Sequence, residues 1–325
     1  MVRIRHGWLV VVLGLGLVTA CKKDEAGGDK SAGSASGSAA ISDDLALLPR
    51  DSEVVIGINV GQAMQSGLWN EYVQPMLTSG EATRRISEFK AKCGVDPMTV
   101  VKSLSLGVKG TSGNKPEGVV VVHGMTKAKA MACLDSMKDD MAKDGTELSH
   151  DGDVVLLKNS RGTQVAMTYV NDSTALAVFG EQANAASVKA AQASDQTLKT
   201  SQPFLEMYKK INTGDSLWML LSGKTLERGA ALGVKPTAVF GSFNVTDGLA
   251  VDLRVRFATP DEATSFAKLG QSQSQQAGKM FDKFEVTNDG PSDVKVALAL
   301  SSQKLKELVG KFSGIARAFG GMGGE

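Results

Sequence analysis

Aromatic residues, histidine and cysteine are scarce in this chain of 325 residues, and each shortage argues against a class of function. Aromatic residues make up 5% of the sequence, too few for a typical sugar-stacking surface or single-stranded nucleic-acid platform, since both need exposed rings. The three histidines and three cysteines form no cluster with the spacing of a zinc site. No metal, nucleotide or other cofactor is therefore expected.

Excess charge of either sign is also missing. The chain has 36 basic and 35 acidic residues, and it keeps 34 and 35 once Arg3 and Arg5 leave with an N-terminal signal. A balance this close to zero gives no electrostatic reason to expect DNA or RNA as a partner.

The first 20 residues have the pattern of an export signal. Arg3 and Arg5 supply a basic start, and an uncharged apolar stretch runs from Gly7 to Val18. This stretch is shorter than the roughly 20 residues that a membrane-spanning helix needs. Its length is typical of the apolar part of a secretory signal.

The string Val18-Thr19-Ala20-Cys21 at the end of this segment resembles a bacterial lipobox. The resemblance implies cleavage after residue 20 and lipidation of the Cys21 thiol, usually with acylation of its amine. Two or more acyl chains anchor a protein stably, so the membrane is an expected partner. The alternative is an ordinary signal peptide whose first mature residue is cysteine. Lys22, where inner-membrane lipoproteins have aspartate, favours the outer membrane, facing the periplasm or the cell surface.

Residues 21–40 hold the lipidated cysteine and a flexible linker, because Gly, Ser and Ala alternate from Ser31 to Ala40 and cannot bury a core. Two folded halves are expected to follow, at 41–200 and 201–325. Alternating apolar residues predict strands at 51–60, 101–108, 118–123, 147–150, 153–158, 163–170, 175–179, 215–221, 237–245, 249–257, 284–287 and 294–300. Helices are predicted at 61–93, 126–143, 181–193, 259–280 and from Ser301 onward.

Both halves repeat an order of strand, helical or irregular stretch, two strands, helix and hairpin. The sequence therefore predicts an α+β fold with antiparallel sheets and helices packed on one face. Chance recurrence of a β-β-α pattern is the alternative to a duplication. The opening LALLPRDSEVVIGINV is similar to that of large secreted or lipid-anchored bacterial domains with no assigned activity, and the resemblance carries no functional residue.

With Cys21 lipidated, Cys93 and Cys133 remain. Proteins outside the inner membrane meet an oxidising environment, so a structural disulfide between them is predicted, with two free buried thiols as the alternative. The bond would close a loop of 40 residues and stabilise the fold by roughly 4 kcal/mol.

The remaining candidate residues for chemistry are few. His123 ends an apolar strand, where a hydrogen-bonded structural role is favoured over that of a general base. His150 adjoins Asp151 and Asp153, and a solvated turn is favoured over a metal site. The final helix has an apolar stripe from Leu305 to Phe319 that favours packing on the sheet over lying on a membrane. The Ser-x-x-Lys strings Ser112/Lys115 and Ser301/Lys304 are assigned to chance, as is the incomplete phosphate-loop string at 222–225.

These observations favour a non-enzymatic envelope lipoprotein that scaffolds or binds a partner protein. A carrier of an apolar, lipid-like ligand is the first alternative, because helix-capped sheets can enclose a lipid-sized cavity. A hydrolase without a recognisable motif is the second.

Overall fold

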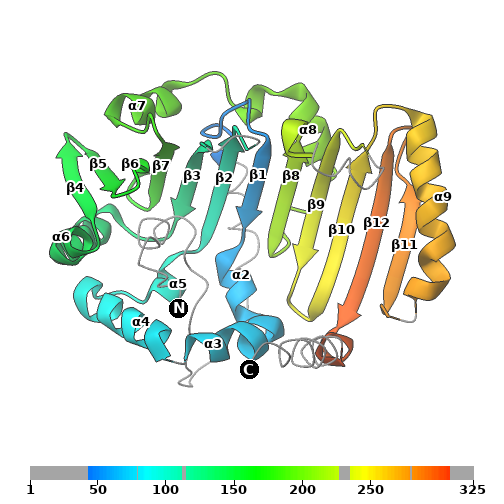
Figure 1. The fold of residues 1–325 in the computed structure, drawn as a ribbon, viewed down its shortest axis with the longest axis horizontal. Coiled ribbons are helices and arrows are strands. Elements are labelled where there is room, and N and C mark those ends of the chain that lie inside the picture. The colour runs from blue at the N-terminus through cyan, green and yellow to red at the C-terminus, as the bar shows by residue number, and fades with distance from the viewer. Residues whose placement is uncertain (1–42, 79, 112–114, 227–234, 279, 308–325) are drawn as a thin grey trace, which may run out of the picture.

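A computed structural model describes residues 43–78, 80–111, 115–226, 235–278 and 280–307. One antiparallel sheet forms the body of this part of the chain (Figure 1). From edge to edge its strands follow the order β11-β12-β10-β9-β8-β1-β2-β3-β7-β6-β5-β4. The predicted α+β class and antiparallel pairing are confirmed, but the sheet is continuous across both halves. None of the described helices is long and apolar enough to cross a membrane.

The strands lie close to their predicted positions. Valine and isoleucine dominate β1 and β3, as expected for strands buried in a sheet. Their bounds are β1 Val54–Ile58, β2 Ser103–Lys109, β3 Glu117–His123, β4 Thr146–Asp151, β5 Val154–Asn159, β6 Gln164–Asn171, β7 Thr174–Gly180, β8 Leu217–Ser222, β9 Ala238–Asn244, β10 Gly248–Arg256, β11 Lys283–Asn288 and β12 Asp293–Ser301.

Several of the helices, α6 and α9 among them, begin where a side chain bonds a free backbone N–H group. The Thr126 hydroxyl accepts from the Lys129 amide, and Thr259 and Glu262 form the predicted capping box before α9. The bounds are α2 Val60–Gln65, η1 Trp69–Val73, α3 Gln74–Leu77, α4 Gly80–Cys93, α5 Pro97–Val100, α6 Lys127–Lys143, α7 Ala185–Ala193, η2 Leu198–Thr200, α8 Gln202–Tyr208 and α9 Pro260–Ala277. The stretch 61–93 is thus a series of short helices, and α8 was not predicted.

The sheet has two faces that differ in what covers them. Face A is the one that carries Val55 and Trp218, and face B carries Ile56 and Met219, since successive residues of a strand point to opposite sides. The long helices α6 and α9 both pack on face B, whereas the short helices α7 and α8 pack on face A. The predicted placement of helices on one face therefore holds for the long helices alone.

The main core lies under face A, where α7, α8 and the segment 43–48 cover the middle of the sheet. Its largest fully buried side chains are Trp218 and Phe240. The Tyr208 ring of α8 meets Trp218 edge-on, with ring centroids 5.2 Å apart. On face B, α6 covers β4 to β7 through Leu134 and Met141, and α9 covers β11 and β12 through Ala263 and Ala267.

The pairing of β1 with β8 joins the two halves at the middle of the sheet. Ile56 pairs with Met219 at its centre. Outward from this pair, β1-β2-β3-β7 on one side corresponds to β8-β9-β10-β12 on the other. The long helices α6 and α9 follow corresponding strands, β3 and β10. The first half has one additional hairpin, β4-β5, and the proposed duplication stays a prediction.

Candidate functional site

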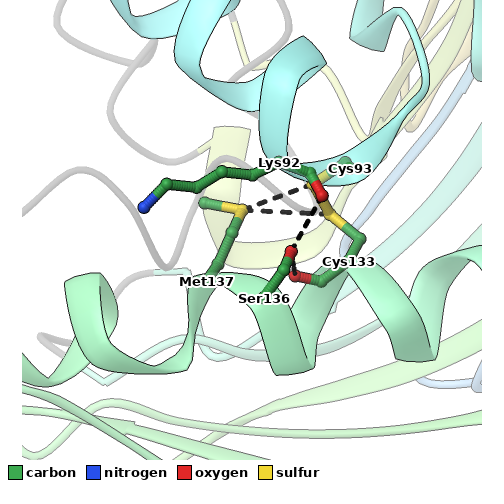
Figure 2. Close-up of a disulfide and its surroundings, with 5 residues drawn as sticks. All are labelled: Lys92, Cys93, Cys133, Ser136 and Met137. Carbon is green, nitrogen blue, oxygen red and sulfur yellow. Dashed lines mark hydrogen bonds between the residues drawn. A yellow bond between two sulfur atoms is a disulfide. The ribbon is translucent and has the colours of Figure 1, made fainter.

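The predicted cysteine pair is joined in the structure. Cys93 at the end of α4 and Cys133 in α6 form a disulfide with a Cα–Cα distance of 4.4 Å. Figure 2 shows the Met137 thioether beside both sulfurs, 3.6 Å from Cys93 Sγ and 3.8 Å from Cys133 Sγ. The Ser136 hydroxyl donates to the Lys92 carbonyl at 3.1 Å, and Lys92 also pairs with Asp140.

These contacts attach α4 to the body of the protein. No residue of α4 is fully buried, so burial of apolar surface alone holds it weakly. The disulfide and its neighbours therefore have a structural role in fixing α4 against α6.

His123 lies in a buried polar network on face A rather than in a cavity. Its Nε2 lies 2.8 Å from Asp44 Oδ1, and its Nδ1 lies 3.1 Å from the Thr174 hydroxyl. The second Asp44 oxygen accepts from the Ser105 hydroxyl at 2.6 Å. Asp44, Ser105 and Thr174 are all buried. Both ring nitrogens of His123 thus have partners, as expected for the structural role.

The network resembles a hydroxyl–histidine–carboxylate chain, but its hydroxyl is inaccessible. Thr174 has 6% of its surface exposed, and it borders neither the depression beside Val119 nor the one beside Arg50. A nucleophile needs room for a reacting atom about 3 Å away. The network instead holds the first described residues, 43–48, against the sheet.

The other predicted candidates do not assemble into a site. His150 is exposed on β4, and within the described ranges no group of three His, Cys, Asp or Glu side chains could hold a metal ion. Ser301 accepts from the Lys304 amide, while the Lys304 ammonium binds the Phe281 carbonyl at 3.0 Å. Cys21, Ser112 and residues 227–234 and 308–325 lie outside the described residues.

A network of ions covers the outer part of face A. Asp293 accepts from Arg256 Nε at 2.7 Å and from Lys210 Nζ at 2.9 Å, and Arg254 donates to Asp289 at 2.8 Å. Burial raises the pKa of Asp293, but the hydrogen bonds from Arg256 and Lys210 lower it by more, so the net shift is downward. Each charge named here has a partner, which indicates a structural role for the network.

Face B has the opposite character at the centre of the sheet. Every side chain that β1, β8, β9, β10 and β12 place on this face is apolar or glycine. We call its middle part, between the cores under α6 and α9, the central apolar face. Its half-buried members are Ile56, Leu217, Met219, Leu221, Val239, Phe243, Leu249, Leu253 and Leu298.

None of these nine side chains belongs to the packed cores that the described helices form. The helices α6 and α9 pack on the outer strands, and α2 packs on β2 and β3 through Val60. The part of face B that lies between α2 and α9 spans β8, β9 and β10. This face was not predicted, although β8 carries a signal for it. The string LWMLL is apolar at consecutive positions, as in strands that are covered on both faces.

Two depressions lie on the described part of the chain. One depression of about 200 Å³ lies beside Val119, Val178 and Phe179. A second, of about 440 Å³, is open and bordered by Arg50, Asp51 and Gln196. Pockets for small molecules typically have about 300–1,000 Å³ and a mostly apolar lining. Neither depression has both the volume and the mostly apolar lining of such a pocket.

Comparisons with known proteins identify no family. No family model matches the chain, and no curated protein matches it. A solved structure titled "Structure of crystal form III of TP0453" has a TM-score of 0.47 and 9% sequence identity, over 82% of this chain and 96% of that chain. A likeness at this level says nothing about function.

Proposed function

We propose that this protein is a membrane-anchored lipoprotein of the cell envelope whose folded domain binds a partner protein without catalysis. The anchor is the lipid on Cys21, and the binding surface is the central apolar face. That face is the single observation that carries the proposal, because apolar side chains grouped on one surface of a sheet need a cover.

The size of the face suits a protein contact. Five strands about 4.8 Å apart and about seven residues long give a sheet area of roughly 500 Å², of which the half-buried side chains of the central apolar face expose only a part. The largest contiguous apolar patch on a soluble monomer typically has about 300–600 Å² and is often functional. A typical protein interface buries about 800 Å² on each partner, so the central apolar face can supply its core.

Strand β10 places charged side chains on one face of the sheet and apolar side chains on the other. On β10, face A carries Asp252, Arg254 and Arg256, whereas face B carries Leu249, Val251, Leu253 and Val255. This alternation is typical of a sheet with one solvated and one covered face. A carrier of an apolar ligand is less well supported, since it needs an enclosed apolar cavity.

The test uses the full lipidated chain in its own envelope. A photoreactive amino acid at Phe243, on the central apolar face, should give a discrete cross-linked product with one protein. The same group at the exposed Thr287, on face A of β11, is the matched control. Leu253→Asp should abolish the product, and Lys295→Asp, on the opposite face, should leave it unchanged.

Two results would overturn the proposal. Equal cross-linking at Phe243 and Thr287 would show that the contact is unspecific. A native mass of the purified protein that exceeds the chain and its anchor by an extractable lipid, without a protein cross-link, would favour the carrier. Labelled palmitate, incorporated in the wild type and absent from Cys21→Ser, tests the anchor separately.

A further inference from the structure

The two edges of the sheet differ in how they are protected. At one edge β11 lies under α9, and at the other β4 has no neighbouring strand on its outer side in the described part of the chain (Figure 1). An edge strand presents a row of unpaired backbone N–H and C=O groups, which is a template for pairing with another chain. The register of the neighbouring strands identifies these outward groups on both edges.

On β11 the outward groups are partly occupied. The Asp289 amide donates to the Asp293 carbonyl at 2.8 Å, and alternate residues of an antiparallel strand bond the same neighbour. The odd-numbered residues of β11 therefore bond β12, and the even-numbered ones, including Val286, point their backbone groups outward. Gln271 of α9 donates from its side chain to the Val286 carbonyl at 3.0 Å. A second chain cannot pair with the middle of β11 without breaking this bond.

The outward groups of β4 follow from the same reasoning. The Asn159 amide donates to the Thr163 carbonyl at 3.0 Å, so the odd-numbered residues of β5 bond β6 and the even-numbered ones bond β4. Their partners on β4 are odd-numbered, so the even-numbered residues of β4 point their backbone groups outward. These outward residues are Thr146, Leu148 and His150. The row has no counterpart of the Gln271 contact in the described part of the chain.

We propose that β4 pairs antiparallel with β4 of a second copy of this chain, centred on Leu148, so that the sheet continues from one copy into the other. In this register Leu148 lies opposite its own counterpart. Thr146 then lies opposite His150 on one face of the joined sheet, and Glu147 lies opposite Ser149 on the other. The three outward residues of each strand give about six backbone hydrogen bonds between the copies.

The charges of β4 select this register. Like charges directly opposite each other destabilise a strand pair, and charged side chains on an edge limit unwanted pairing. Centring the pair on Glu147 would place two Glu147 side chains opposite each other, and centring it on Ser149 would place Glu147 opposite Asp151. The pair centred on Leu148 avoids both arrangements. Lys158, directly opposite Glu147 on β5, adds a positive charge beside the acidic side chain.

The symmetry of the pair suits two anchored chains. Its two-fold axis is perpendicular to the sheet at Leu148, so face A of both copies points to the same side. The segment 43–48 packs on face A, so the described part of each chain begins on that side, as two lipid anchors in one membrane require. This step rests on the anchor of the proposed function.

The same anchors assist the pairing energetically. Strands of six residues bury little surface, and interfaces of this size are typical of weak association. Two chains held on one membrane meet at a higher effective concentration than two free chains. The pair is therefore expected at a membrane surface and at high chain density.

The test uses the full lipidated chain in vesicles of phosphatidylethanolamine and phosphatidylglycerol. A photoreactive amino acid at the exposed His150 should give a product of twice the chain mass, in which position 150 is joined to residues 146–148 of the other copy. The same group at the exposed Asn288, on the protected edge strand β11, is the matched control and should give almost none of this product.

Two substitutions of the exposed Ser149 test the register. Ser149→Lys places a basic side chain opposite Glu147 of the other copy and should strengthen the pair, whereas Ser149→Glu places two acids opposite each other and should weaken it. Each contact occurs twice in the dimer, so the yields at limiting chain density should differ about tenfold. The double variant Glu147→Lys/Ser149→Glu restores opposite charges and should restore the product.

Absence of the product at every chain density, or equal yields from Ser149→Lys and Ser149→Glu, would overturn the inference. A product in cells that joins position 150 to another protein, without the chain dimer, would overturn it in favour of an extended segment of a partner. Failure of the proposed function is distinguishable, because cross-links at Phe243 report the contact of the central apolar face and palmitate labelling reports the anchor.

Discussion

The packing of Trp218 against Gly57 leads to a sharp prediction about stability. Gly57 lies in the middle of β1 and pairs directly with Trp218 of β8, and the indole covers the glycine on face A. A Cβ atom added at Gly57 would lie 2.1 Å from Trp218 Nε1 and 2.3 Å from its Cε2 atom. Real Cβ atoms do not approach other heavy atoms so closely, so Gly57→Ala must displace the ring.

The magnitude follows from the burial of the ring. Trp218 is fully buried and is held by Tyr208 on its other side. Overpacking a well-packed core costs about 1–3 kcal/mol, and complete loss of a large aromatic side chain costs about 3–5 kcal/mol. We expect Gly57→Ala to lower the free energy of unfolding by about 3 kcal/mol, where the two ranges meet.

The assay is equilibrium unfolding in urea. With an m-value of about 3 kcal/mol/M, a loss of about 3 kcal/mol moves the midpoint down by about 1 M. Gly61→Ala in α2 is the matched control, because a Cβ there meets no atom within 4 Å and alanine is about 0.5–1 kcal/mol better than glycine in a helix. Gly61→Ala should therefore be slightly stabilising.

Equal midpoints for the two glycine variants would refute the reasoning. A second check uses Trp218→Phe, which removes the part of the ring that the new Cβ meets. In a protein that already carries Trp218→Phe, Gly57→Ala should lower the free energy of unfolding by less than half as much as it does in the wild type. Additive costs would mean that the two positions do not interact.

Three further outcomes can be measured in the same way. Replacing Cys93 and Cys133 by serine should lower the free energy of unfolding by up to about 4 kcal/mol, the loop-closure value for 40 residues, and reducing agent should have no further effect on the variant. Asp44→Asn, which weakens a buried charge-assisted network, should cost about 2 kcal/mol and speed proteolysis near the N-terminal end of the domain, whereas Asp43→Asn should change neither. Because the pKa of Asp293 is lowered in the fold, stability should fall as the pH drops below about 4, and Asp293→Asn should reduce this fall in acid titrations of unfolding.

Local signals in the sequence were sufficient for most individual elements. The Asp151-Gly152 pair predicts the β4–β5 hairpin, and Gly152 has the positive φ of 60° that this turn requires. Thr259 and Glu262 form the capping box that their spacing predicts. In both cases the deciding contacts are between residues a few positions apart, so a short window of sequence contains the information.

The features that were missed depend on residues far apart in the chain. The antiparallel pairing of β1 with β8 turns two expected sheets into one, and no turn signal connects these strands. The partner of His123, Asp44, lies 79 positions away. The central apolar face emerges only when five strands from both halves lie side by side, although the consecutive apolar residues of β8 already indicate a strand covered on both sides.

The position of β1 also affects the order in which the chain folds. Ile56 and Met219 pair across 163 positions of sequence, so the inner edge of the first half stays open until β8 has been synthesised. An open edge strand rich in valine and isoleucine is a template for pairing with other chains, and loop closure over such a distance is slow. The finished sheet therefore requires that this edge be protected while the rest of the chain is synthesised.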